Sequence, residues 1–345
     1  MKKLFLSAAL LAASLASQAQ QAPLWMRYPA ISPDGKTIVF SYKGDIYSVP
    51  ATGGEARQLT TNAAHDSYPI WSPDGKKIAF ASNREGSFDV YVMPAHGGTP
   101  TRITTNSERE IPVAFKDNDH VLFSANIMPT AESNLFASRE FSQVYEVSTQ
   151  GGRPKLYSVI PMEDISINAK GQVLYHDSKG YEDQWRKHHT SPITRDIWML
   201  DNGKYQKITA FKGEDRTPVW AADGESFYYL SEQAGSFNIY HRNIATGKDV
   251  QLTHEKKNPI RFLTSSADGL LCYGYDGEIY TVKEGAQPQK VNISITADND
   301  EPSLVRQVRS WGATEIALSP DAKEVAFVMH GDVYVTSTEY KTTKR

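Results

Sequence analysis

The sequence predicts an all-β fold, a β-propeller whose blades each contain four strands. Three observations predict it: a repeat of about 40 to 50 residues, turn residues at fixed places in each repeat, and short runs of β-branched and aromatic residues between the turns. Some of these runs, such as 90–93, are apolar on both faces, and stacking of blades around an axis would cover both. No long stretch keeps the helical period, so helical repeats are not expected.

Each repeat unit begins with a tight turn. Ser-Pro-Asp-Gly stands at 32–35 and again at 72–75, where proline fixes φ at the second position of a type I turn and glycine occupies the fourth. Weaker copies stand at 116–119, 168–171, 221–224, 266–269 and 319–322. Each turn is followed by a short apolar run that is predicted to be a strand.

A second phrase, of the type Asp-Ile-Tyr, follows each turn. Its copies stand at 45–47, 89–91, 143–145, 196–198, 238–240, 278–280 and 332–334. A Gly-Gly pair often follows, as at 53–54, and permits the positive φ of a tight hairpin before a closing Leu-Thr or Ile-Thr. The repeated Asp45, Asp89, Asp196 and Asp332 could form an acidic ring, but their periodic placement favours bonds to turns or backbone.

The units suggest a complete ring followed by part of another. Six units fill 24–294, and a polar stretch at 295–310 is predicted to be a linker. A seventh unit at 311–345 is predicted to be the incomplete first blade of a second propeller, because the chain stops where its last strand would run. This indicates the front part of a longer protein, and a single seven-bladed ring is the alternative.

Residues 1–19 are predicted to be a signal peptide. Lys2 and Lys3 precede an apolar stretch at 4–15, and the small residues Ser17 and Ala19 place cleavage before Gln20. The apolar stretch is too short for a typical membrane anchor, which is the alternative. We therefore expect an exported, periplasmic protein with no membrane span after cleavage.

Composition excludes several classes of function. Lys and Arg number 37 and Asp and Glu 40, a net charge of −3 that argues against nucleic-acid binding. Cys272 is the single cysteine, so neither a disulfide framework nor a multi-thiolate metal site is possible. Its neighbours Leu271 and Tyr273 predict a buried strand residue, not a nucleophile. No cofactor is expected.

Catalytic motifs are absent from the sequence. It contains no Gly-x-Ser-x-Gly elbow and no glycine-rich phosphate loop. His188 and His189 are adjacent and would point to opposite faces of a strand, so no metal site is predicted. They belong to an insertion at 176–190, where Trp185 and Arg186 are candidate interface residues because both types are enriched at binding hot spots. Packing of Trp185 onto its own blade is equally compatible with this composition.

The two phrases resemble propeller repeats of tricorn-type proteases, of the TolB translocation protein and of the dipeptidyl peptidase IV group. Three features favour the tricorn type. The repeats begin by about residue 24, which leaves no room for the domain that precedes the propeller in TolB. The inserted Trp-Arg-Lys-His-His at 185–189, followed by Arg-Asp-Ile-Trp at 195–198, resembles the Trp-Lys-x-Tyr-x-Gly-Gly…Asp-Ile-Trp stretch of tricorn first propellers. Six units, a linker and a new unit also resemble the tricorn order.

The resemblance implies that the parent protein is an oligomeric serine peptidase that degrades short peptides. Its propellers would act as channels and filters for peptides, and its catalytic residues would lie in later domains, so none is assigned here. Tricorn-type proteins can anchor the substrate carboxylate with an adjacent basic pair, whereas this sequence has the separated Arg102 and Arg109. Arg109 is therefore only a candidate substrate-binding residue. The alternatives are a TolB-like protein-binding module and the propeller of a dipeptidyl-peptidase-IV-like enzyme.

Overall fold

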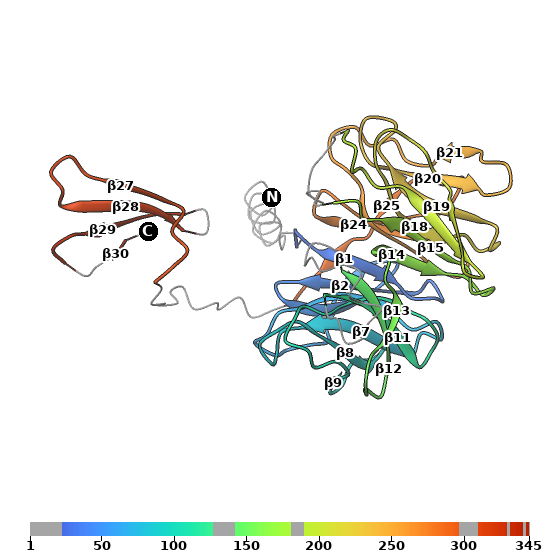
Figure 1. Cartoon of the computed structure of the whole chain (residues 1–345), viewed down its shortest axis with the longest axis horizontal. Helices are drawn as coiled ribbons and strands as arrows, with labels where there is room; N and C mark the ends of the chain where they lie inside the picture. Colours follow the sequence, from blue (N-terminus) through green and yellow to red (C-terminus); the bar gives the residue numbers. More distant parts are fainter. Residues whose placement is uncertain are drawn as a thin grey trace, which may run out of the picture. The chain divides into compact units, whose positions relative to one another are not determined.

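The computed structural model describes residues 23–126, 142–180, 190–296, 310–329, 332–340 and 343–344. The chain divides into two compact units, Met1–Thr296 and Ala297–Arg345 (Figure 1). The predicted signal peptide and most of the predicted linker lie outside the described residues, as do Trp185, Arg186, His188 and His189. Over the described ranges, no helix is long and apolar enough to cross a bilayer.

The first unit contains six four-stranded sheets, and in each the strands pair antiparallel in chain order. The first three sheets comprise β1 (Arg27–Ile31), β2 (Thr37–Tyr42), β3 (Asp45–Pro50) and β5 (Arg57–Gln58); β6 (Asp66–Trp71), β7 (Lys77–Ser82), β8 (Asp89–Pro94) and β9 (Thr101–Arg102); and β10 (Ile111–Phe115), β11 (His120–Ala125), β12 (Gln143–Ser148) and β13 (Lys155–Ser158). The other three comprise β14 (Met162–Ile167), β15 (Val173–Asp177), β16 (Ile197–Asp201) and β17 (Lys204–Lys207); β18 (Asp215–Trp220), β19 (Ser226–Ser231), β20 (Asn238–Asn243) and β21 (Asp249–Gln251); and β22 (Arg261–Ser265), β23 (Leu271–Tyr275), β24 (Glu278–Val282) and β25 (Gln289–Lys290).

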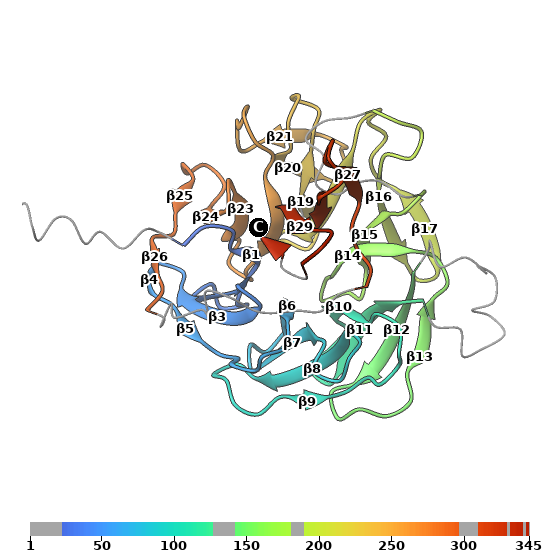
Figure 2. The same ribbon diagram turned by 90° about the vertical axis from the view of Figure 1, so that its left-hand side faces the viewer.

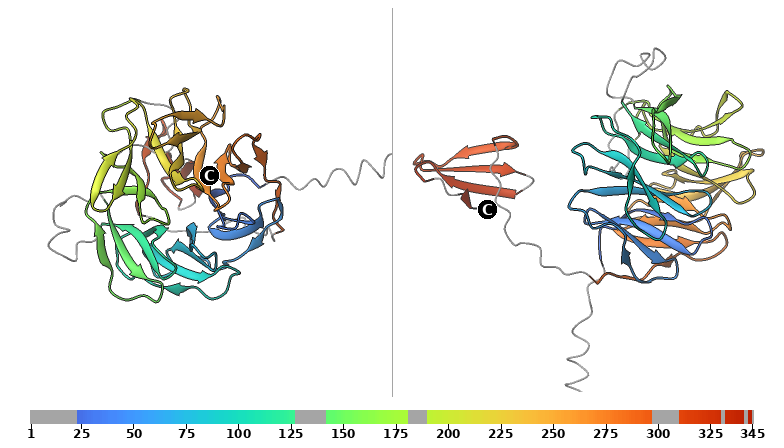
Figure 3. Two further views of the ribbon diagram at one scale, coloured as in Figure 1. Left: turned by 90° about the vertical axis from the view of Figure 1, so that its right-hand side faces the viewer. Right: turned by 90° about the horizontal axis from the view of Figure 1, so that it is seen from below.

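These sheets are arranged around a common centre. The first strands of neighbouring sheets contact one another in the order β1, β6, β10, β14, β18 and β22, and β22 contacts β1 again. Figure 2 shows β1, β6, β10 and β14 near the centre and β9, β13, β17, β21 and β25 at the periphery, and Figure 3 shows the ring from the opposite side. The predicted all-β propeller of four-stranded blades is confirmed.

The last residues of the first unit complete the contact between its sixth and first sheets. β26 (Ile293–Ser294) pairs in parallel with β4 (Gly54–Glu55). Gly53 permits this approach, because a Cβ atom there would lie 2.6 Å from the carbonyl oxygen of Asn292. At the same junction, the Met26 N–H donates to the carbonyl of Gly277 at 3.1 Å.

The core consists of apolar layers between neighbouring sheets. In the first unit, the apolar run after each turn is buried, as at Ile38 and Ile78. An aromatic residue of the second strand often stacks on the tyrosine of the Asp-Ile-Tyr phrase, as Phe80 does on Tyr91 with ring centroids 5.9 Å apart. Cys272 lies buried in β23 as predicted, and burial raises the pKa of its thiol.

The two sequence phrases form two recurrent sets of hydrogen bonds. In the first turn, the Ser32 hydroxyl donates to Asp34 at 2.6 Å and accepts the Thr37 N–H at 3.0 Å. In the second set, the hydroxyl of Thr60 accepts the Ile46 N–H at 2.9 Å and donates to Asp45 at 3.1 Å. Asp45 therefore orients the threonine that satisfies the backbone, which is the kind of structural role predicted for it.

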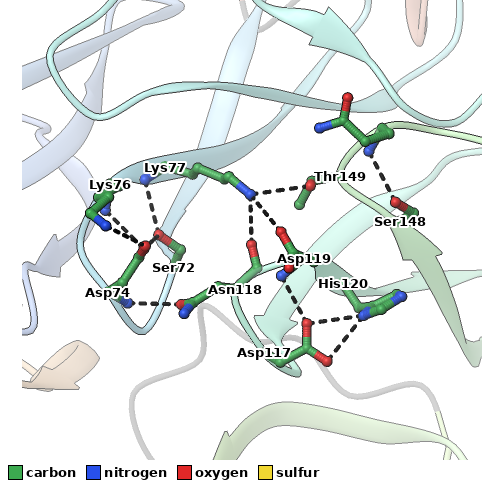
Figure 4. A network of polar contacts seen from close by, with 11 residues as sticks. Ser72, Asp74, Lys76, Lys77, Asp117, Asn118, Asp119, His120, Ser148 and Thr149 are labelled. Carbon is green, nitrogen blue, oxygen red and sulfur yellow. Dashed lines mark hydrogen bonds and ion pairs between the residues drawn. The ribbon is translucent and has the colours of Figure 1, made fainter.

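Hydrogen bonds and an ion pair also join the second and third sheets at their turns. Lys77, after the turn of the second sheet, donates to the Asn118 carbonyl at 2.8 Å and to Asp119 at 3.0 Å in the third sheet (Figure 4). The Asp74 N–H donates to the Asn118 side chain at 3.0 Å. The repeat therefore builds each sheet and also fixes it to the next.

The second unit contains one sheet of the same kind. It consists of β27 (Glu315–Leu318), β28 (Glu324–Met329), β29 (Asp332–Ser337) and β30 (Thr343–Lys344), paired antiparallel in chain order.

Candidate functional site

A bulge interrupts the first strand of every sheet in the first unit. The register with the second strand shifts after the first or second residue of the first strand, for example between Arg27 and Ala30 and between Arg216 and Val219. The other four shifts fall after Ser67, Pro112, Glu163 and Arg261. Bulges redirect side chains and occur often beside functional sites.

Five of these six bulges hold a residue with left-handed backbone geometry. The residues and their φ angles are Tyr28 (54°), Tyr68 (56°), Asp164 (48°), Thr217 (52°) and Phe262 (61°). We call these five residues the bulge ring. They lie on the innermost strands, at the ends opposite the Ser-Pro-Asp-Gly turns, so they mark one end of the centre of the propeller.

Three members of the bulge ring form an aromatic arc across the sixth, first and second sheets. Tyr28 stacks on Tyr68 with centroids 4.0 Å apart, and the two hydroxyls are hydrogen-bonded at 3.0 Å. Phe262 contacts Tyr28 edge-on at 4.9 Å. Burial raises the pKa of Tyr28, so its hydroxyl stays protonated at physiological pH.

Arg109, the basic residue singled out in the sequence, lies at one end of this arc. Its guanidinium donates to the Tyr68 hydroxyl at 3.2 Å and lies 5.7 Å from the centre of that ring. It also lies 5.6 Å from the ring of Phe88. Arg109 is exposed, whereas Arg102 lies on the outermost strand of its sheet and is paired with Asp89 at 2.9 Å. The structure therefore places Arg109 beside the central strands of the propeller and Arg102 on an outermost strand.

The remaining two members of the bulge ring form a polar arc on the fourth and fifth sheets. The hydroxyl of Thr217 donates to Asp164 at 2.6 Å, and the N–H of Thr217 donates to Nδ1 of His176 at 3.2 Å. The hydroxyl is thus bonded to the carboxylate of Asp164, and the imidazole of His176 accepts the backbone N–H of Thr217.

A group of ionisable side chains packs next to the polar arc. Nε2 of His176 lies 3.1 Å from Glu163, and the Arg195 guanidinium lies 3.4 Å from the same carboxylate. Burial opposes ionisation of Glu163, but the hydrogen bond with His176 and the charge of Arg195 outweigh it and lower the pKa to about 2. Arg216 is buried beside Glu214 at 3.5 Å, and burial lowers its pKa to about 10. This ionic layer fixes the polar arc in place.

Pairs of carboxyl groups meet between neighbouring sheets, at or directly before the first residues of their strands. Asp45 faces Asp66, and Asp89 faces Glu110. Burial raises the pKa of Glu110 to about 7, and Asp89 adds to this effect. The side chains of Arg84 and Arg102 offset part of the repulsion, the first donating to Asp66 at 2.6 Å and the second paired with Asp89.

A third pair, Asp196 and Asp215, joins the fourth and fifth sheets. Burial raises the pKa of Asp215 to about 6, and the charge of Asp196 adds to the shift. Lys179 and Lys207 both pair with Asp196. Three of the four repeated aspartates, Asp45, Asp89 and Asp196, therefore belong to carboxyl pairs between sheets.

Sequence reasoning missed the bulge ring. A signal for it exists: Tyr-Pro at 28–29 and 68–69 and Thr-Pro at 217–218 each stand just before a turn phrase. Among the described residues, no group of three or more His, Cys, Asp and Glu side chains is placed to hold a metal ion. The bulge ring thus combines an aromatic arc and a polar arc at one end of the centre of the propeller.

Comparison with known proteins decides the family. Residues 23–288 match the model of the tricorn protease N-terminal β-propeller domain. The chain belongs to this family. The tricorn resemblance inferred from the inserted segment and the unit order is thereby confirmed.

The solved structure of the tricorn protease supports the fold, and two further solved structures are similar to this chain. The crystal structure of the tricorn protease matches with a TM-score of 0.68 and 19% identity over 93% of this chain, which corresponds to 31% of the tricorn chain. The chain therefore spans about a third of that protein. Puromycin hydrolase (S511A mutant complexed with PGG) matches with a TM-score of 0.49 and 13% identity over 92% of this chain and 53% of its own. TolB from Acinetobacter baumannii matches with 0.48 and 13% over 90% and 76%. A search of curated proteins found no match.

Proposed function

We propose that this chain is the peptide-selecting propeller of an exported, tricorn-like serine peptidase and has no hydrolytic activity by itself. The observation that carries the proposal is the bulge ring, a polar and aromatic set of side chains at one end of the centre of a tricorn-family propeller. Short peptides would pass or dock there, and hydrolysis would take place in domains that this chain does not contain. Those domains and further copies of the protein are the partners we infer.

The proposed arrangement of domains follows the sequence units. Residues 24–294 form a six-bladed propeller, 295–310 a linker, and 311–345 the first blade of a second propeller. The closed cycle of contacts among six first strands supports the first boundary, and the separate compactness of Ala297–Arg345 supports the second. Trp185 and Arg186 remain candidate contacts with another copy or domain.

Arg109 is the proposed substrate-binding residue. Its guanidinium is exposed and flanked by two aromatic rings, and in the described part of the chain no carboxylate pairs with it. A peptide carboxylate could therefore bind it without breaking an existing ion pair.

Titration of the whole chain with unblocked tripeptides, followed by calorimetry, tests this role. Arg109→Ala should weaken binding about three- to tenfold, as expected for a partly exposed charged contact. Arg153→Ala is the matched control, because Arg153 is also exposed but lies in the Gly-Gly turn between β12 and β13. Equal affinities for the two variants would remove Arg109 from the proposal. If folded proteins bind and no peptide does, the chain is a protein-binding module instead.

Export is tested by N-terminal sequencing of the protein from the periplasmic fraction of a producing bacterium. We expect the mature chain to begin at Gln20. A protein that keeps residues 1–19 and sediments with membranes would support the anchor alternative.

A further inference from the structure

The bulge ring places large side chains in a backbone conformation that disfavours them. Left-handed φ suits glycine and asparagine, and it is an outlier for bulky or β-branched residues. Tyr28, Tyr68 and Phe262 adopt it at φ values of 54°, 56° and 61°. Strain of this kind persists where the surrounding structure imposes it. Asparagine would fit the same bulges with less strain, so the sequence keeps aromatic rings where local stability alone does not require them.

These three rings are only partly covered by the protein. Each is half-buried, unlike the fully buried aromatic residues of the core such as Phe40 and Phe80. They contact one another across two junctions between sheets, so together they form one aromatic surface. Such a surface gains free energy by covering its remaining exposed area with another ring.

The surroundings of the aromatic arc indicate what can cover it. Arg109 adds a positive charge at one end, and Asp164 and Thr217 present polar atoms on the other side of the bulge ring. A ligand that fits has an apolar side chain for the arc, an anionic group for Arg109 and backbone polar groups for the polar arc. A short peptide has all three.

We propose that Phe262, Tyr28 and Tyr68 form a subsite for an aromatic side chain of the bound peptide. This inference rests on the proposed function, because it names the side-chain class that the peptide-binding propeller prefers. The rings of Tyr28 and Phe262 already meet edge-on, and an incoming phenyl ring would extend the same packing.

The test compares Ala-Phe-Ala with Ala-Ala-Ala, titrated into the whole chain by calorimetry. The two peptides share both termini, so the contact with Arg109 is constant. We expect Ala-Phe-Ala to bind about tenfold more tightly, the effect of one buried aromatic contact. Phe262→Asn should reduce this preference to about twofold or less. Tyr205→Asn is the control and should keep it, because Tyr205 is an exposed aromatic on the outermost strand of the fourth sheet.

Asparagine suits the left-handed backbone at 262, so we expect the Phe262→Asn chain to fold with an unchanged circular dichroism spectrum. Phe262→Leu provides a second variant that keeps apolar volume and loses the ring, and an intermediate preference is expected. Equal affinity of the unmodified chain for both peptides overturns the aromatic subsite and leaves the peptide-selecting role in place. Absence of binding for both peptides overturns the subsite and the proposed function together.

Discussion

The first sheet of the propeller and the sheet of the second unit share their local geometry and differ in burial. In both, the turn serine donates to the turn aspartate, at 2.6 Å for Ser32 and 2.7 Å for Ser319. In both, a second-strand phenylalanine stacks on the tyrosine of the repeated phrase, with centroids 5.8 Å apart for Phe40 and 5.6 Å for Phe327. The repeat therefore determines turn and cross-strand geometry within a single sheet.

The burial of a side chain, by contrast, depends on whether its sheet packs against neighbouring sheets. Ile46 follows the aspartate of the repeated phrase and is 0% exposed, whereas Val333 at the same place in the second unit is 59% exposed. Ile31 and Leu318, each directly before the turn, are 4% and 60% exposed. The same pattern thus gives a core residue where a sheet has neighbours and a surface residue in the single sheet of Ala297–Arg345.

Truncation of these matched residues should give the largest difference between the units. Ile46→Ala leaves a cavity between two sheets and should lower the free energy of unfolding by about 2–4 kcal/mol. Val333→Ala should change it by less than about 0.5 kcal/mol, because the side chain is already exposed. Urea denaturation followed by intrinsic fluorescence measures both. Equal effects would show that Val333 is buried in solution.

A change of pH should affect the first unit through its buried carboxyl pairs. The pKa of Glu110 is raised to about 7 by burial, with Asp89 adding to the shift, while the hydrogen bonds from Thr104 and Asn106 act against it. The folded state then binds more protons than the unfolded state between the ordinary pKa and about 7, so stability falls as pH rises through this range. We expect a loss of about 1–2 kcal/mol between pH 5 and pH 8, after allowance for solvent screening.

Two Glu→Gln variants, one buried and one exposed, identify the group responsible for this loss of stability. Glu110→Gln should remove most of the slope, whereas Glu225→Gln, at an exposed turn, should keep it. The raised pKa of Asp215, about 6, also makes stability fall as pH rises, but over a lower pH range than for Glu110. The lowered pKa of Glu163 makes stability fall as pH decreases, and only at pH values below the ordinary pKa of a glutamate. Thermal denaturation at several pH values measures the effect, and an unchanged slope in the Glu110 variant would contradict the assignment.

The smallest effect should come from exchanging one turn residue between the units. Gly75 has φ of 69° in the second sheet, and Ala322 holds the corresponding position in the second unit at 59°. Gly75→Ala should destabilise the first unit by about 1 kcal/mol, because an added Cβ meets only Pro33 at 3.7 Å and the cost is conformational. Ala322→Gly should stabilise the second unit by a similar amount. Hydrogen exchange of each sheet measures both, and a destabilising Ala322→Gly would indicate a different turn in solution.

Much of the fold could be predicted from the sequence because its signals are local. The turns, the repeated phrase and the burial of Cys272 each depend on a few adjacent residues. The contacts of the aromatic arc could not be predicted in this way, because Tyr28, Tyr68 and Phe262 meet only when three sheets are in place. Arg109 was singled out through a family resemblance, and its position beside Tyr68 required the structure.

The junction between the first and sixth sheets has a consequence for folding kinetics. The Ile31 N–H donates to the hydroxyl of Thr264 across a sequence separation of 233 residues, whereas the other sheets join neighbours one repeat away. Loop-closure entropy rises only with the logarithm of length, so this contact costs roughly 1.5 kcal/mol more than a contact across one repeat. Such a distant contact is nevertheless slow to form, because it becomes favourable only after the intervening chain is compact. We therefore expect closure of the ring to be the last and rate-limiting step of folding, and opening at this junction to be the first step of unfolding.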